Sequence, residues 1–288
     1  MPKPIDILYV ASEADPFIKS GSIGDLAGSL PKTVKAMGHD IRVMLPGYSS
    51  INCRRFQIHN LLRMKDFGIP VSGRSEQASV RSSYLNSENQ KVLVYFLAND
   101  RYFNREGLYF HPTTKKYFAD NDERFIFFCR GVLETLKKLR WQPQIIHCND
   151  WQCGLIPAYL NSIYKNDPFF KNVKTVFSVF SLASHGSFPK NSFEKAGLPP
   201  QLYGEYGDSL GRLNFLTAGL AFADVITTLG NRADRGIRIS PQDDVDRVLQ
   251  ARKNSIVPMG NASHNGNGQG LLAMKFIDVY RELAKNGR

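Results

Sequence analysis

The sequence predicts an α/β protein with an open, doubly wound, mostly parallel sheet. Three observations support this: apolar runs of strand length, helical runs with apolar residues three and four positions apart between them, and glycine, proline or polar residues at the junctions. Strands that alternate with helices pair in parallel through right-handed crossovers. Because ligands of such sheets bind beyond the carboxyl ends of the strands, we expect the chemistry in the strand-to-helix loops.

The first β-α-β unit is the clearest in the sequence. Strands are predicted at residues 5–11 and 40–45, with a helix at 23–37 between them. Pro31 is expected to kink that helix, because its ring clashes with the carbonyl four residues earlier. Gly38 is expected to end it.

The same alternation continues to residue 229. The predicted elements are, in chain order, a strand at 91–98, a helix at about 122–139, a strand at 144–148, a helix starting near 150, a strand at 174–182, a helix at 212–223 and a strand at 225–229.

Residues 259–270 have the composition of a linker. They are almost entirely glycine, asparagine, serine and glutamine, which cannot bury enough apolar surface to order themselves. The following helix has one apolar face, formed by Leu272, Phe276, Val279 and Leu283. We therefore expect one domain over residues 1–258, the linker, and a helix over 271–288 that packs back on the same domain.

The net charge of +11 arises from 37 Lys and Arg against 26 Asp and Glu, which favours anionic partners. The basic residues are scattered, and the densest run, Lys137, Lys138 and Arg140, lies near a predicted helix end where cations stabilise the helix dipole. A solvated basic face is the preferred interpretation, and no nucleic-acid partner is expected.

The four cysteines form no CxxC pair, and a chain of this length does not need disulfides. We expect reduced, mostly buried thiols. His147, Cys148 and Cys153 lack tetrahedral zinc spacing, so neither a metal nor a cofactor is expected. The sequence has no signal-peptide pattern and no apolar run long enough for a membrane span, which predicts a cytoplasmic protein without membrane contact.

The first predicted strand-to-helix loop holds a candidate phosphate site. Lys19, Gly21 and Gly24 would combine a cation with backbone that an anion can approach closely at a helix N-terminus. Neither a Walker A nor a GxGxxG pattern is present. On spacing alone, a plain turn with Asp25 in the first helical turn is the favoured alternative.

Two further loops follow predicted buried strands. His147, Asp150 and Trp151 either face a cleft or serve as core and helix cap, and the residue types do not decide between these. His185, in the next loop, is as compatible with a solvated side chain as with a functional one.

Taken in order, these loops resemble those of bacterial glycogen synthases and plant starch synthases, over residues 5–255. The resemblance rests on LYVASEADPFIKSGSIGDLAGSLPK at 8–32, YFNREGLY at 102–109, DNDERFIFFCRGVLE at 120–134, IIHCNDWQCGLIPAYL at 145–160, NFLTAGLAFADVITT at 214–228 and ARK at 251–253. It implies the Rossmann-like N-terminal half of a two-domain GT-B glycosyltransferase.

The resemblance also implies an activity, the transfer of glucose from ADP-glucose or UDP-glucose to the non-reducing end of an α-1,4-glucan. The donor loop of the family corresponds to Lys19, Gly21, Ser22, Gly24 and Asp25, with Ser22 in place of a family glycine. The residues implied to border the cleft and the acceptor are His147, Asp150, Trp151, Phe180, Ser181, His185 and Asn214.

The largest departure from the family lies at residues 179–186, where the family carries V-H-N-L-A-Y-Q-G. Phe180 replaces a histidine that, by resemblance, contacts the reacting sugar, and no confident catalytic residue remains there. Loss of one preorganised polar group costs on the order of 100- to 1000-fold in rate. Ser181, Ser184 and His185 also differ from the family.

The donor-binding second half of the family has no counterpart in the sequence, so we expect an internally deleted relative. The first hypothesis is a chain without activity of its own, with weak or absent nucleotide-sugar binding, that binds α-glucan or a protein partner through the exposed cleft. The alternatives are an active transferase completed by a separate nucleotide-binding chain, and a regulatory subunit of a true glycogen synthase.

Overall fold

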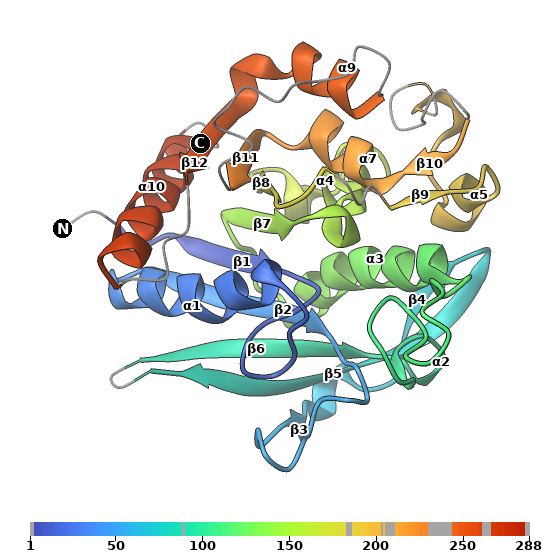
Figure 1. The fold of residues 1–288 in the computed structure, drawn as a ribbon, viewed down its shortest axis with the longest axis horizontal. Coiled ribbons are helices and arrows are strands. Elements are labelled where there is room, and N and C mark those ends of the chain that lie inside the picture. Colours follow the sequence, from blue (N-terminus) through green and yellow to red (C-terminus); the bar gives the residue numbers. More distant parts are fainter. Residues whose placement is uncertain are drawn as a thin grey trace.

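A mixed sheet crosses the centre of the computed structural model. The structure describes residues 3–87, 90–182, 186–202, 204, 211–229, 244–260 and 266–285. Its parallel strands are, in spatial order, β12 (Ile256–Gly260), β11 (Val225–Leu229), β8 (Lys174–Val179), β7 (Ile145–Asn149), β1 (Asp6–Val10), β2 (Asp40–Pro46) and β6 (Lys91–Ala98). The predicted fold class, open and mostly parallel, is confirmed (Figure 1).

The strand order reverses between β1 and β7. From β1 the chain moves to β2 and β6 on one side, and from β7 to β8, β11 and β12 on the other. Such a reversal is a topological switch point, where the loops leaving the two strands diverge and open a crevice at their carboxyl ends. The loops that follow β1 and β7 therefore form the sides of the expected site.

An antiparallel extension completes the sheet, in a region for which the sequence predicts no element. It consists of β3 (His59–Asn60), β4 (Phe67–Val71) and β5 (Arg74–Asn86). The first part of β5, to Ala78, pairs with β4, and the rest, from Ser79, pairs with β6. Along β5 buried and exposed positions alternate, but serine, arginine and glutamine occupy so many of them that the apolar signal is weak.

Helices cover both faces of the sheet (Figure 1). One face carries α1 (Ser22–Ala36) and α10 (Gly266–Lys285), which contact each other, and the other carries α3 (Asn121–Leu139), α4 (Leu155–Leu160) and α7 (Phe215–Phe222). Shorter elements are α2 (Asp100–Phe103), α5 (Ser192–Ala196), α9 (Asp244–Ala251), η1 (Leu62–Met64), η2 (Trp151–Cys153), η3 (Pro168–Phe170), η4 (Pro200–Leu202) and η5 (Lys253–Ser255).

Several predicted boundaries differ from the structure. The helix predicted from residue 150 is a 3-10 turn, η2, followed by α4. The strand predicted to reach residue 182 ends at Val179. Helix α7 begins three residues later than predicted, because Leu213–Asn214 form a strand, β10. This strand pairs with β9 (Ser187–Phe188). Helix α1 continues through Pro31.

The predicted linker is shorter than its composition indicates. Residues 259 and 260 belong to β12, residues 266–270 belong to α10, and 261–265 lie outside the described residues. As predicted, α10 packs back on the domain, where it contacts α1 and β7. Its buried face includes Phe276 and Tyr280, both fully buried.

The described helices include none that is both long and apolar enough to cross a bilayer. Cys129, Cys148 and Cys153 are buried free thiols and Cys53 is an exposed one, which agrees with the prediction of mostly buried thiols.

Candidate functional site

The loop that leaves β1 (the β1 loop, residues 11–21) begins buried and ends exposed. Ser12 and Glu13 are buried within it, whereas Lys19, Ser20 and Gly21 face solvent. The loop is fixed at its base because the amide of Ala11 donates to the carbonyl of Met44, and that of Asp15 to the carbonyl of Gly24. Its exposed end is thus held against the start of α1.

The exposed end of the β1 loop presents an uncapped helix N-terminus. Gly21 is the N-cap of α1 and makes no side-chain cap, and its carbonyl accepts hydrogen bonds from the amides of Gly24 and Asp25 at 3.1 and 3.4 Å. Lys19 Nζ lies 2.6 Å from Asp25 Oδ1, and this ion pair raises the pKa of Lys19. A Cβ on Gly24 would lie 2.7 Å from the Cβ of Lys19, so glycine is required there. Ser22, the first helical residue, is exposed beside them.

Glu13 connects the β1 loop to a second loop. Its Oε1 accepts a hydrogen bond from the hydroxyl of Tyr109 at 2.6 Å and one from Ser20 Oγ at 2.8 Å, and its Oε2 accepts from the Ser20 amide. Burial and the Glu13 charge raise the pKa of Tyr109. Glu13 was not predicted as a site residue, although a carboxylate just after an apolar strand is a signal that could have identified it.

The β7 loop, residues 150–154, forms the other side of the switch point and is buried. Asp150 has a positive φ of 58°, which is strained for a non-glycine residue, and its Oδ1 accepts a hydrogen bond from the Trp151 amide at 2.9 Å. Burial raises the pKa of Asp150 to about 7, and the Glu13 charge acts in the same direction. Asp150 therefore caps η2 and also lies at the switch point.

Trp151 is a core residue beneath the loops. Only 3% of it is exposed, and its ring contacts those of Phe125, Phe188 and Phe215 at centroid distances of 5.0, 5.8 and 6.3 Å. A Cβ on Gly186 would lie 2.3 Å from the indole, and Gly186 has a φ of +58°, so the loop after β8 rests on this ring through a glycine.

His147 does not join the other predicted site residues at the carboxyl edge. It is fully buried, with Nδ1 2.6 Å from the hydroxyl of Tyr280 on α10 and Nε2 2.7 Å from Ser178 Oγ. Burial lowers its pKa to about 3. His147 is therefore a neutral core histidine that joins β7 to α10 and β8.

The other residues predicted to border the cleft differ in burial and in their contacts. Asn214 is 2% exposed and caps α7, because its Oδ1 accepts a hydrogen bond from the Thr217 amide at 3.0 Å. Phe180 and Ser181 are half-buried just beyond β8, with Phe180 packed against the core. His185 lies outside the described residues.

The chemistry available at this edge is the binding of a polar ligand. Across the described ranges, no three His, Cys, Asp or Glu side chains converge as a metal would require. An anion would meet a helix N-terminus without a side-chain cap, with Lys19 beside it. The carboxyl groups of Glu13 and Asp150 lie buried beneath this edge.

Comparison with known proteins gives consistent matches. The starch synthase catalytic domain family matches residues 6–250. The glycogen synthase of Desulforudis audaxviator is 38% identical over 271 residues, 90% of this chain and 51% of that protein, and that of Geotalea daltonii is 39% identical over 253 residues, 87% and 50%. The chain thus spans about half the length of these relatives.

The fold has a solved counterpart. The catalytic domain of starch synthase IV from Arabidopsis thaliana, bound to ADP and acarbose, superposes with a TM-score of 0.76 at 20% sequence identity, covering 89% of this chain and 51% of that one.

Proposed function

The chain belongs to the family of bacterial glycogen synthases and plant starch synthases, and we propose that its carboxyl edge is an acceptor site that binds an α-1,4-glucan. We propose further that these 288 residues do not transfer glucose alone. The starch synthase IV counterpart binds acarbose, an oligosaccharide analogue, together with ADP.

An exposed aromatic pair carries the glucan proposal. Phe110 and Tyr117 are 40% and 53% exposed, and their ring centroids are 4.1 Å apart. Aromatic faces stack on the C–H faces of glucose rings, and two rings in contact at the surface offer a sugar a larger face than a single ring does.

The aromatic pair is held beside the switch point. Phe110 follows Tyr109, whose hydroxyl binds Glu13 in the β1 loop. A backbone bridge pairs Phe110 with Tyr117, and the His111 amide donates to the Lys116 carbonyl at 2.9 Å. The pair is therefore a fixed platform at the edge where the ligand is expected.

Two substitutions support a defect in transfer. By resemblance, Phe180 occupies the position of the family histidine, and Ser22 places a side chain where the family donor loop has glycine. Glycine lets a donor phosphate approach the backbone closely, and a preorganised polar group stabilises developing charge, so each substitution weakens one of these functions.

Calorimetric titration tests the proposal. We expect the purified chain to bind maltoheptaose, and the double variant Phe110→Ala/Tyr117→Ala to bind it at least about 10-fold more weakly, since aromatic stacking contributes on the order of 1 kcal/mol per ring. Tyr84→Ala is the matched control, because Tyr84 is 51% exposed on β5, away from the switch point. Equal loss in the control, or no binding by the wild type, would contradict the glucan site and favour a protein partner.

A glucose-transfer assay with ADP-glucose and glycogen tests the second part. We expect no incorporation of glucose by the isolated chain. Measurable transfer would overturn this part of the proposal and leave the glucan site unaffected.

The open N-terminus of α1 favours a second candidate, an active transferase completed by a separate chain. The start of α1 has no side-chain cap, and Lys19, paired there with Asp25, is half-exposed, so a diphosphate could approach this helix end. Mixing the chain with the nucleotide-binding half of a glycogen synthase should then restore transfer, and Lys19→Ala should reduce it. If the mixture stays inactive, this candidate is wrong.

A further inference from the structure

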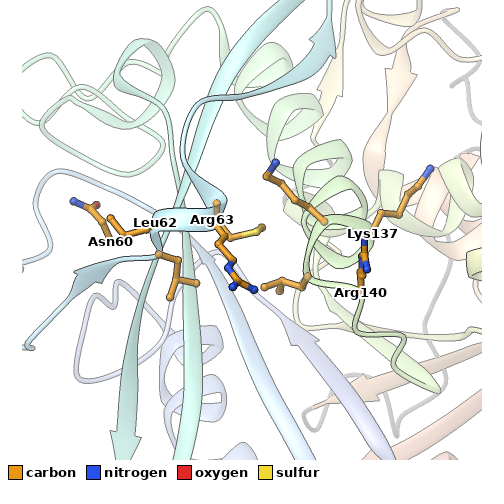
Figure 2. A pocket seen from close by; sticks show the side chains of 9 residues that line it. Asn60, Leu62, Arg63, Lys137 and Arg140 are labelled. Carbon is orange, nitrogen blue, oxygen red and sulfur yellow. The ribbon is translucent and has the colours of Figure 1, made fainter.

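A basic groove lies at the edge of the molecule opposite the candidate site. Its volume is about 950 Å³, and it is lined by residues 60–64, which include η1, and by residues 137–140 at the end of α3. Since residues 141–144 lead from α3 to the start of β7, this is the amino edge of the parallel strands. Figure 2 shows Arg63 on the η1 side and Lys137 and Arg140 on the α3 side.

The charged side chains of the groove all have the same sign. They are Arg63, Lys137, Lys138 and Arg140. Lys137 Nζ pairs with Asp167 at 2.6 Å, and Lys138 lies over the ring of Phe67. Among the described residues, no carboxylate forms an ion pair with Arg63 or Arg140. An anion in the groove would relieve this repulsion.

The groove also presents apolar surface. Leu62 is 86% exposed, Leu61 and Leu139 are half-buried, and Met64 is buried beneath them. A leucine exposed to this extent beside unpaired cations gives the groove both a charged and an apolar component.

Stabilisation of the helix dipole explains only part of the cluster. Cations in the last turn of α3 are favourable, which accounts for Lys137 and Lys138. Arg63 comes from another element, η1, and is not part of the last turn of α3. Arg140 is the C-cap at a φ of 53°, where glycine is the preferred residue, so the arginine is present despite a local conformational cost.

We propose that this groove binds an acidic segment of a partner protein that carries a large apolar side chain. Carboxylates would pair with Arg63 and Arg140, and the apolar side chain would cover Leu62. The described residues that line the groove include no aromatic ring, so they offer no surface for base stacking by a nucleic acid or for stacking by a glucan. The site is separate from the glucan site, and both surfaces can be occupied at the same time.

Fluorescence anisotropy with a labelled synthetic peptide of aspartate, glutamate and leucine tests the groove on the intact chain. We expect binding that weakens as salt increases, because exposed charges are screened. Arg63→Glu/Arg140→Glu should weaken it at least about 10-fold, since like charges across an interface are strongly unfavourable. Leu62→Ser should weaken it about 3-fold or more through the loss of apolar burial.

The matched control is Lys190→Glu/Lys253→Glu, which makes the same change in net charge at exposed lysines outside the groove. The control should bind the peptide as the wild type does, and all variants should keep the wild-type unfolding midpoint and maltoheptaose affinity. Equal weakening in the control, an unchanged Leu62→Ser variant, or tighter binding of a single-stranded oligonucleotide than of the peptide would overturn the proposal. So would the absence of peptide binding at low salt.

Discussion

The β1 loop and the β7 loop, on the two sides of the switch point, differ in how deeply their side chains are buried. The end of the β1 loop is exposed, and the charged groups of Lys19 and Asp25 are 47% and 40% exposed as side chains. In the β7 loop Asp150 and Trp151 are each 3% exposed. One side of the switch point therefore presents groups that a ligand can contact, whereas the other is a buried wall formed by the β7 loop.

The largest expected effect is a loss of stability on substitution in the buried β7 loop. Trp151→Ala should lower the free energy of unfolding by about 3 to 5 kcal/mol, because a large buried aromatic leaves a cavity. Trp141→Ala is the matched control. Trp141 is half-buried, and the Cζ atom of Arg42 lies 3.8 Å from its ring centroid. Loss of this ring should lower the free energy of unfolding by about 1 kcal/mol. Urea denaturation of both variants measures the difference, and equal losses would show that the wall is not specially packed.

The second effect separates Asp150 from His147 by pH. The folded-state pKa of Asp150 is raised to about 7, so the folded state binds the proton more tightly and stability falls as pH rises from about 4 to about 7. Asp150→Asn should therefore gain stability relative to the wild type over this range, on the order of 1.4 kcal/mol per unit of pKa shift.

His147 should give the opposite slope. Its folded-state pKa is lowered to about 3, so the unfolded chain binds the proton more tightly and stability falls as pH drops from about 6.5 towards 3. His147→Gln should gain stability relative to the wild type on acidification. Unfolding free energies at a series of pH values measure both slopes, and two slopes of the same sign would contradict the burial of one of the two groups.

The smallest effect concerns the exposed side. Lys19→Ala should leave the thermal unfolding midpoint unchanged, because exposed ion pairs contribute little to stability. Lys195→Ala is the comparison, since Lys195 pairs with the buried Asp122 at 2.8 Å, and its loss should cost about 1 to 3 kcal/mol. A clear loss of stability in Lys19→Ala would mean that the β1 loop is structural rather than open to ligand.

The sequence predicted those elements whose own apolar pattern is enough to identify them as strand or helix. The strands at 91–98 and 225–229 match the structure at both ends, because each is rich in β-branched, aliphatic or aromatic residues. The strand after residue 174 was predicted too long, since Phe180 and Leu182 continue the apolar run after the chain has left the sheet. The hairpin of β4 and β5 was missed because polar residues occupy much of it.

The site was predicted in part for the same reason. Its location follows from the order of strands and helices, and Lys19, Asp25 and Asp150 do lie at the carboxyl edge. His147 does not, because its surroundings depend on Tyr280, 133 residues later in the chain, which local sequence patterns cannot reveal. The role of Glu13 likewise depends on Tyr109, 96 residues away.

The docking of α10 has a kinetic consequence. Its contacts with α1 and with His147 join segments that are far apart in the chain, and contacts of large sequence separation form late in folding. Until they form, the side of β7 that faces Phe276 is exposed to water, and this surface is open to association with other chains. We therefore expect the delay between formation of the sheet and docking of α10 to determine how long a folding molecule is prone to aggregate.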